Sequence, residues 1–265
     1  GISIMRYIRF NGAANKEMSQ TNKKWRDKMT NDGFLQALEE SFKRFISSGT
    51  SRSTAKLIPL HGAIARDMHE RFGADYAIHS QGYATGTEGT IMGHYMGKKV
   101  DIMISHNGKP VCGIAVKFVM QNYSQNSNNY FENMLGETAN IRAAKCPYFQ
   151  LFAIPKHLPY YDRSGTIMRW ETITRHNLEK YFILNADNPE VFYHSPNKTL
   201  IYVVQLPDIG EVQTKEEYRA GYERYFSIND TEFMTIANVG EFGNSVIHNN
   251  YELFAEKIYH TVHAL

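Results

Sequence analysis

The chain has 265 residues, of which 42% are apolar and 13% aromatic, enough to fill a sizeable hydrophobic core. The formal net charge of +2 permits a polyanionic partner without requiring one. The sequence has neither a long apolar run nor a secretion-signal pattern, so we expect a cytoplasmic protein without a membrane span. Cys112 and Cys146 lack any zinc-ligand spacing, and we expect both to be buried thiols.

The first part of the chain has a helical pattern. A polar stretch begins near residue 15, and Phe34, Phe42 and Ile46 then recur at helical spacing. After a break rich in Ser, Gly and Thr, a second helix is expected to begin near Pro59 and end at Gly73, because glycine suits a helix C-cap. These helices are expected to pack against a sheet.

From residue 77 onward the pattern favours strands, and apolar runs at 147–155 and 200–206 are also strand-like. Helices are expected between residues 126 and 145 and from residue 252 to the end. This order predicts an α/β fold with a mixed central sheet flanked by helices. We expect one domain over residues 1–265, with a helical N-terminal part at about 15–57, a core at about 58–206 and a C-terminal elaboration at about 207–265.

Residues 100–118, VDIMISHNGKPVCGIAVKF, predict a hairpin whose apolar strands carry one carboxylate and one ammonium. A plain two-residue loop at Asn107-Gly108 would place Asp101 and Lys117 on opposite faces. Pro110 cannot donate a ladder hydrogen bond and Gly113 suits a bulge, so a loop of odd length or a bulge is expected. Asp101 would then lie opposite Ala115, on the face that carries Lys117.

An aspartate and a lysine side by side at the end of a sheet suit metal-assisted hydrolysis of a phosphodiester. The carboxylate holds a divalent cation, and the ammonium orients the attacking water and offsets developing charge. Mg²⁺ generally binds a second acid, with water and phosphate oxygens completing its shell. A second carboxylate is therefore expected near Asp101.

Asp101, the hairpin, the IAVKF segment and the following helix resemble the core of the PD-(D/E)xK nuclease superfamily, over roughly residues 60–206. The chain as a whole resembles a bacterial type II restriction endonuclease. The resemblance implies a restriction-endonuclease-like core, Mg²⁺ as cofactor and cleavage of double-stranded DNA that leaves a 5′-phosphate. It also implies that Asp101 binds metal, that the Val116 carbonyl is a further ligand, and that Lys117 orients the water.

Ala115 departs from this pattern, because the family places its second acid at that position. Some family members supply the acid from the next helix, where Glu132 is the favoured candidate and Glu137 the reserve. These two residues differ by about 140° on a helical wheel, so one of them should face the sheet. Two alternatives remain: a natural DNA-binding protein that does not cut, or a restriction enzyme inactivated by an introduced change at Ala115.

Other polar side chains are weaker candidates. Glu70, on the preceding helix, is a possible outer-shell carboxylate, and Glu88 is a weaker one. His61, His69 and His79 show no metal-ligand spacing, so we interpret them as structural or surface residues.

The run from Asn122 to Asn129 has no charge and many amides. Because Asn and Gln can bond adenine in the major groove, it suits DNA base recognition, although a polar loop with an Asn helix cap explains it equally well. Basic residues upstream could bind phosphates or could simply be solvated. The candidate DNA-binding residues are Asn122, Gln125, Asn126, Asn128, Lys23, Lys24 and Arg52.

The expected partners follow from the resemblance. Palindromic DNA sites favour a homodimer, and a restriction enzyme implies a companion DNA methyltransferase acting on the same site. Residues 82–89, GYATGTEG, contain glycines but lack the Lys-Ser/Thr and the helix start of a nucleotide-binding loop. The sequence thus predicts a nuclease that does not depend on ATP.

Overall fold

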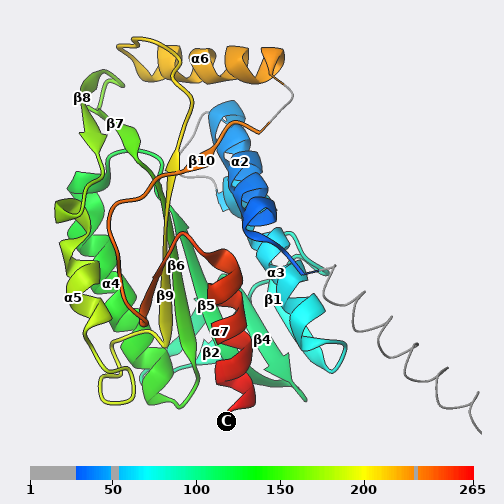
Figure 1. Ribbon diagram of the computed structural model, residues 1–265. Coiled ribbons are helices and arrows are strands. Elements are labelled where there is room, and N and C mark those ends of the chain that lie inside the picture. The colour runs from blue at the N-terminus through cyan, green and yellow to red at the C-terminus, as the bar shows by residue number, and fades with distance from the viewer. Residues whose placement is uncertain (1–27, 49–53, 230–231) are drawn as a thin grey trace, which may run out of the picture.

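The computed structural model describes residues 28–48, 54–229 and 232–265, and its centre is a mixed seven-stranded sheet (Figure 1). The strand order is β1-β4-β5-β6-β9-β10, with β11 paired to β9 as well. The strands of this sheet are β1 (Tyr76–Ser80), β4 (Ile102–His106), β5 (Lys109–Phe118), β6 (Tyr148–Pro155), β9 (Lys198–Gln205), β10 (Thr235–Ile236) and β11 (Val246–His248).

The direction of the strands changes across the sheet. β1, β4 and β5 are antiparallel neighbours, whereas β6 lies parallel to β5 and β9 lies parallel to β6. Helix α4 (Tyr123–Ala143) makes the crossover that a parallel connection needs. All eight residues of β6 are buried, as expected for a central strand covered on both faces.

Helices cover both faces of the sheet (Figure 1). On one face, α2 (Asn31–Ser48), α3 (Ile58–Phe72) and α7 (Tyr251–His263) share a hydrophobic core with β4, β5, β6 and β9. On the other face, α4 and α5 (Glu179–Asn185) pack against β6 and β9. The predicted α/β fold with a mixed, helix-flanked sheet is confirmed, as are the two N-terminal helices that fall within the described residues.

Smaller elements surround this core. Two separate hairpins form from β2 (Gly89–Met92) with β3 (Gly97–Val100), and from β7 (His157–Tyr161) with β8 (Ile167–Thr172). The short helices η1 (Thr54–Leu57) and η2 (His176–Leu178) and the helix α6 (Lys215–Ile228) complete the described elements. Within the described part of the chain, every helix is too short or too polar to cross a lipid bilayer.

The register of the β4–β5 hairpin decides which side chains share a face. Asn107 and Gly108 have positive φ angles of 50° and 74°, the conformation of a two-residue type I′ turn. Ile102 pairs with Ile114, and the register shifts near Pro110, where Val111 is the extra residue. The bulge was predicted, but it lies at Val111 rather than at Gly113.

Gly113 has a packing role instead. A Cβ atom there would approach Ile91 Cδ1 to 2.8 Å and the Tyr148 ring to 3.1 Å. The missing side chain therefore lets the Tyr148 ring lie on β5, on the face that carries Ala115 and Lys117.

Candidate functional site

Asp101 lies between β3 and β4, at the end of the sheet where β5 finishes. Its Oδ2 accepts a 2.7 Å hydrogen bond from the main-chain N–H of Val116, which fixes the carboxylate against β5. Continuing the pairing of Ile102 with Ile114 places Ala115 opposite Asp101 and Lys117 on the same face. The juxtaposition expected from a bulged hairpin is present.

The surroundings of Asp101 and Lys117 perturb both groups. Burial raises the pKa of Asp101, and Glu137 acts in the same direction, while the Val116 N–H, Lys98 and Lys117 oppose it. Partial burial lowers the pKa of Lys117 against the attraction of Glu137 and Asp101. The pKa of the acid is raised and that of the base is lowered, so the two values move toward each other. Such perturbed pairs are typical of catalytic sites.

Lys117 is held by an aromatic ring of α4. Its Nζ lies 3.9 Å from the ring centroid of Tyr130, within cation–π range. Tyr130 and Glu137 are seven residues apart, two helical turns, and so share one face of α4. That face of α4 is turned toward Asp101 and Lys117.

The structure brings Glu137, the reserve candidate, to this site, and not Glu132, the favoured one. Glu137 forms a 2.6 Å ion pair with Lys98 of β3 and accepts a 3.3 Å hydrogen bond from the Tyr148 hydroxyl. Glu132 is exposed on another side of α4, close enough to Lys180 of α5 to act on its charge. The expectation that one of the two would face the sheet is met, but the preference for Glu132 is not, because the phase of the helix turns Glu132 away.

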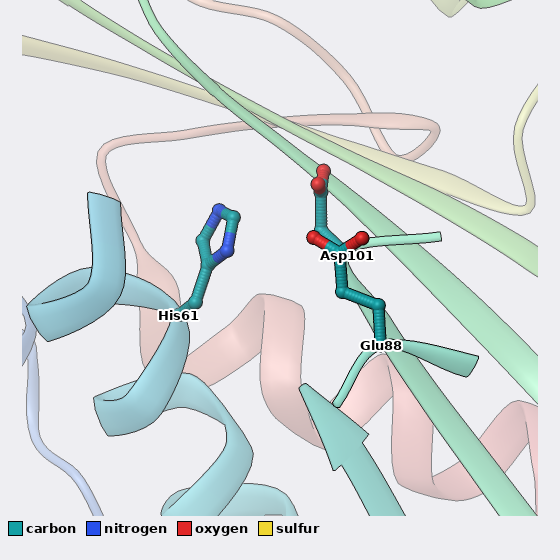
Figure 2. Close-up of side chains that lie close together, drawn as sticks. All are labelled: His61, Glu88 and Asp101. Atoms are coloured by element: carbon teal, nitrogen blue, oxygen red, sulfur yellow. The ribbon is translucent and has the colours of Figure 1, made fainter. Parts of the chain in front are cut away.

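A second group of potential metal ligands meets Asp101 from the other side. One ligand atom from each of His61, Glu88 and Asp101 lies within 4.8 Å of the others. Figure 2 shows the imidazole of His61, from α3, across from the two carboxylates. One nitrogen and two carboxylates arranged in this way could hold a metal ion.

The His61 side chain is buried on α3. Its side chain is 3% exposed, and neither ring nitrogen has a hydrogen-bond partner among the described residues. Burial lowers the pKa of His61 to about 4, with Glu88 acting in the opposite direction, so the ring is neutral at pH 7. Leaving a buried polar group unpaired costs about 1–3 kcal/mol, and the interpretation of His61 as a merely structural residue does not account for this cost.

Two glycines explain how Glu88 reaches His61. A Cβ on Gly62 would lie 2.6 Å from the carbonyl oxygen of Gly82, and a Cβ on Gly82 would lie 2.6 Å from that of Ile58. Only glycine permits such close approach, so the loop before β2 packs directly on the first turns of α3. The glycine-rich stretch that lacks a nucleotide-binding motif thus positions a carboxylate.

The remaining weaker candidates lie elsewhere. Glu70 follows His61 by nine residues, which corresponds to about 13 Å along α3 and to the opposite face of the helix. His69 packs against the Tyr83 ring at 6.1 Å, and His79 lies 3.2 Å from a serine hydroxyl on β4. The interpretation of these two histidines as structural therefore agrees with their contacts.

A polar pocket of about 610 Å³ opens next to Lys117. Lys56 lines it too, and burial lowers the pKa of Lys56, with the charges of Lys117 and Lys215 lowering it further. Three lysines whose fields overlap make this region suitable for an anionic ligand. The pocket is also lined by Gln121, Asn122, Gln125, Asn126 and Tyr130.

The amide-rich run is not a loop, because Tyr123 to Asn129 form the first turns of α4. Glu171 of β8 accepts hydrogen bonds from the main-chain N–H groups of Tyr123 at 2.7 Å and Ser124 at 3.1 Å. A carboxylate from another element therefore caps this helix and complements its dipole. The start of α4 is occupied by protein and does not serve as an anion site.

Several of the predicted DNA-binding amides already have protein partners. Asn122 donates to the Tyr161 carbonyl at 3.0 Å and accepts from the Tyr161 N–H at 2.8 Å, so it ties α4 to β7. Asn128 accepts a 2.7 Å bond from Lys180. Gln125 is exposed at the pocket rim, and Asn126 is hydrogen-bonded to Tyr130. Lys23, Lys24 and Arg52 lie outside the described residues.

Gln150 adds a polar group beside Ala115. The two residues are paired between β5 and β6, and Gln150 is 8% exposed. Its Nε2 has no hydrogen-bond partner within the described ranges. The amide nitrogen can donate to a phosphate oxygen, and the amide oxygen can accept a hydrogen bond, so Gln150 can contact a bound phosphate from the β6 side.

No family model, curated protein or solved structure matches this chain.

Proposed function

We propose that this protein is a metal-dependent nuclease that hydrolyses phosphodiester bonds in double-stranded DNA. The observation that carries the proposal is the position of Asp101, which shares a face with Lys117 and also belongs to a cluster of potential metal ligands. A carboxylate that anchors a cation and an ammonium that is partly desolvated are the two groups this hydrolysis needs.

The topology supports the same function. Apart from the β2–β3 hairpin between β1 and β4, the chain order is α3, β1, β4, β5, α4 and β6: a helix, three antiparallel strands, a crossover helix and a parallel strand. Asp101 and Lys117 occupy the positions in this order at which the PD-(D/E)xK resemblance places its catalytic aspartate and lysine. A restriction-endonuclease-like core is therefore part of the proposal.

The chain's own residues have distinct roles in this reaction. A divalent cation held at Asp101 would polarise the phosphate and lower the pKa of a bound water. The Val116 N–H keeps the Asp101 carboxylate in place, and the Val116 carbonyl is the further ligand that the resemblance implies. Lys117, partly desolvated against Tyr130, orients the water and offsets charge on the phosphate.

The pocket beside Lys117 is the proposed path of the DNA backbone. Lys56, Lys117 and Lys215 supply positive charge, and exposed Gln125, whose Oε1 accepts a 3.4 Å hydrogen bond from Asn122, lies at the rim. Sequence-specific cutting, a homodimer and a companion methyltransferase remain proposals that come from the resemblance to restriction enzymes, with Mg²⁺ as the cofactor it implies.

Ala115 favours a second candidate function, a DNA-binding protein that does not cut. Its methyl group stands opposite Asp101, where the family pattern has an acid, and cannot bind metal. In that case DNA affinity would not depend on a divalent ion. The unchanged chain would not cleave DNA, so Lys117→Ala would have no cleavage activity to remove.

The test is incubation of long unmethylated duplex DNA with the protein, its Asp101→Asn variant and its Ala115→Glu variant, with Mg²⁺, Mn²⁺ or EDTA. The proposal predicts discrete, metal-dependent fragments from the unchanged chain and none from Asp101→Asn. Fragments from Ala115→Glu alone would mean that position 115 is the missing metal ligand and that this chain is inactive. Tight DNA binding without cutting by any variant would establish the second candidate.

A further inference from the structure

We propose that His61, Glu88 and Asp101 form a site for a first-row transition-metal ion, with the His61 imidazole as a direct ligand. The site therefore binds Mn²⁺ or Co²⁺ more tightly than Mg²⁺. This proposal changes both the ligand set and the metal expected from the sequence, which were Asp101, Glu132 and the Val116 carbonyl around Mg²⁺. It rests on the proposed function for the use of the ion, but not for its binding.

His61 is buried and, within the described part of the chain, unpaired beside two carboxylates. Its ring is 3% exposed, both nitrogens lack a partner among the described residues, and it lies across from two carboxylates (Figure 2). Buried polar groups in folded proteins are nearly always hydrogen-bonded, so two unpaired nitrogens that face two carboxylates favour a ligand bound between them. A metal ion between the imidazole and the carboxylates supplies that ligand.

The three side chains lie close enough together to share one ion. Ligand atoms that bind one ion at about 2.1 Å are at most about 4.2 Å apart. The three groups offer atoms within 4.8 Å of one another, so small side-chain rotations complete the geometry. Glu88 can make this adjustment because its Lys99 ion pair is long, at 3.9 Å, and Lys99 is largely exposed.

Backbone contacts behind the cluster hold its side chains in place. The contact between Gly62 and Gly82 fixes the loop before β2 against α3, and the Val116 N–H fixes Asp101. Two of the three ligands thus approach from elements that are already locked together. Ligand preorganisation of this kind reduces the cost of binding an ion.

The donor set decides which metal is preferred. Mg²⁺ takes oxygen ligands almost exclusively and keeps several waters, whereas imidazole suits transition metals. One neutral imidazole with two carboxylates neutralises a divalent ion. Three protein ligands also leave positions for water and a phosphate oxygen, as catalytic metal sites require.

The experiment measures metal binding to the full chain without DNA, by calorimetric titration with Mn²⁺, Co²⁺ and Mg²⁺ separately. We expect Mn²⁺ and Co²⁺ to bind at least about tenfold more tightly than Mg²⁺. His61→Gln should weaken Mn²⁺ binding at least about tenfold, with a much smaller change for Mg²⁺. His69→Gln, on the same helix but against the Tyr83 ring, is the matched control and should change neither.

A second readout avoids substitution altogether. In the unchanged protein, Mn²⁺ should broaden the imidazole NMR signals of His61 before those of His69 and His79, and Co²⁺ should give the visible absorption of a nitrogen-containing site. Equal affinity for Mg²⁺ and Mn²⁺, or broadening that spares His61, would overturn the proposal. Selective Mn²⁺ binding without DNA cleavage would support the metal site and contradict the proposed nuclease. Mg²⁺-dependent cleavage that His61→Gln leaves unchanged would support the nuclease and contradict the metal site.

Discussion

Asp101 separates two groups of charged and ionisable side chains that the fold treats differently. On the α4 side, Glu137 is paired with Lys98 at 2.6 Å and accepts a hydrogen bond from Tyr148. On the α3 side, His61 has no partner among the described residues, and Glu88 has only a long contact with an exposed lysine.

This comparison distinguishes polar groups that hydrogen-bond within the protein from polar groups that can bind a ligand. A folded protein satisfies most of its buried polar groups, because each unpaired group costs about 1–3 kcal/mol. Among the described residues, Tyr202 leaves a single hydroxyl unpaired in the core, whereas both nitrogens of His61 are unpaired and face two carboxylates that could share a ligand with them. We therefore place the metal on the α3 side of Asp101 and assign Glu137 a role in shaping the field around Lys117.

The largest expected effect comes from Asp101→Asn, which removes the ligand common to the metal cluster and the catalytic face. Metal-dependent cleavage should fall by about 10³-fold or more, because both metal anchoring and water activation are lost. Single-turnover cleavage of a labelled duplex measures this loss.

Stability provides the control for that variant. Burial raises the folded-state pKa of Asp101 above 3.8, so the charged carboxylate costs stability at neutral pH. Urea unfolding without metal should therefore find Asp101→Asn at least as stable as the unchanged chain. A less stable variant would mean that its lost activity reflects damage to the fold.

Lys117→Met should have the next largest effect, about 10²-fold or more on the cleavage rate. Its stem still packs against Tyr130, and the metal ligands are untouched, so the affinity for Mn²⁺ should change by less than about threefold. Cleavage rates and metal titration of the same preparation separate the two effects. If Lys117→Met lost metal binding together with activity, Lys117 would contribute to the metal site, contrary to the separate roles proposed for the α3 and α4 sides.

His61 should make stability depend on pH. Its folded-state pKa of about 4 lies below the ordinary value of 6.5, so the unfolded chain binds the extra proton as the pH falls between these values. Without metal, the stability is complete above pH 6.5 and decreases by up to about 3 kcal/mol toward pH 4.

Urea unfolding of the unchanged chain and of His61→Gln at pH 7, 6 and 5, with EDTA, measures that dependence. The difference between the two proteins should narrow or reverse as the pH falls, because the glutamine does not titrate. Parallel curves would show that His61 is not the buried neutral histidine described here.

The smallest effect is expected from Glu137→Gln. Its ion pair with Lys98 is about one-third exposed, and Glu137 acts on Lys117 and Asp101 through its charge rather than as a ligand, so cleavage should change by no more than about fivefold. Glu132→Gln, on the other side of α4, should leave the rate unchanged. A loss near that of Asp101→Asn for Glu137→Gln would move the metal to the α4 side, and the same result for Glu132→Gln would restore the sequence-based choice.

The sequence correctly predicted the features that depend on local backbone chemistry. Asn107 and Gly108 indicate the tight turn and Pro110 favours a bulge, and together these correctly predicted that Asp101 and Lys117 share a face. Helical spacing likewise showed that Glu132 and Glu137 could not both face the sheet. It could not show which one does, because that depends on how α4 is rotated by its packing against β6.

His61 and Glu88 lay beyond reach of the sequence for a different reason. A single histidine between Leu60 and Gly62 has no spacing signal, and its significance comes from burial without a partner. Glu88 joins it through the close packing of Gly62 on Gly82, a long-range contact that no local pattern encodes. The one available sign was a polar residue within an otherwise apolar helix face.

The most direct test of the two-sided account is a crystal grown with Mn²⁺ and measured at a wavelength where manganese scatters anomalously. We predict a peak bounded by His61, Glu88 and Asp101, with Glu137 still paired to Lys98. A peak between Asp101 and Glu137 with His61 unliganded, or no peak at Asp101 at all, would contradict the account.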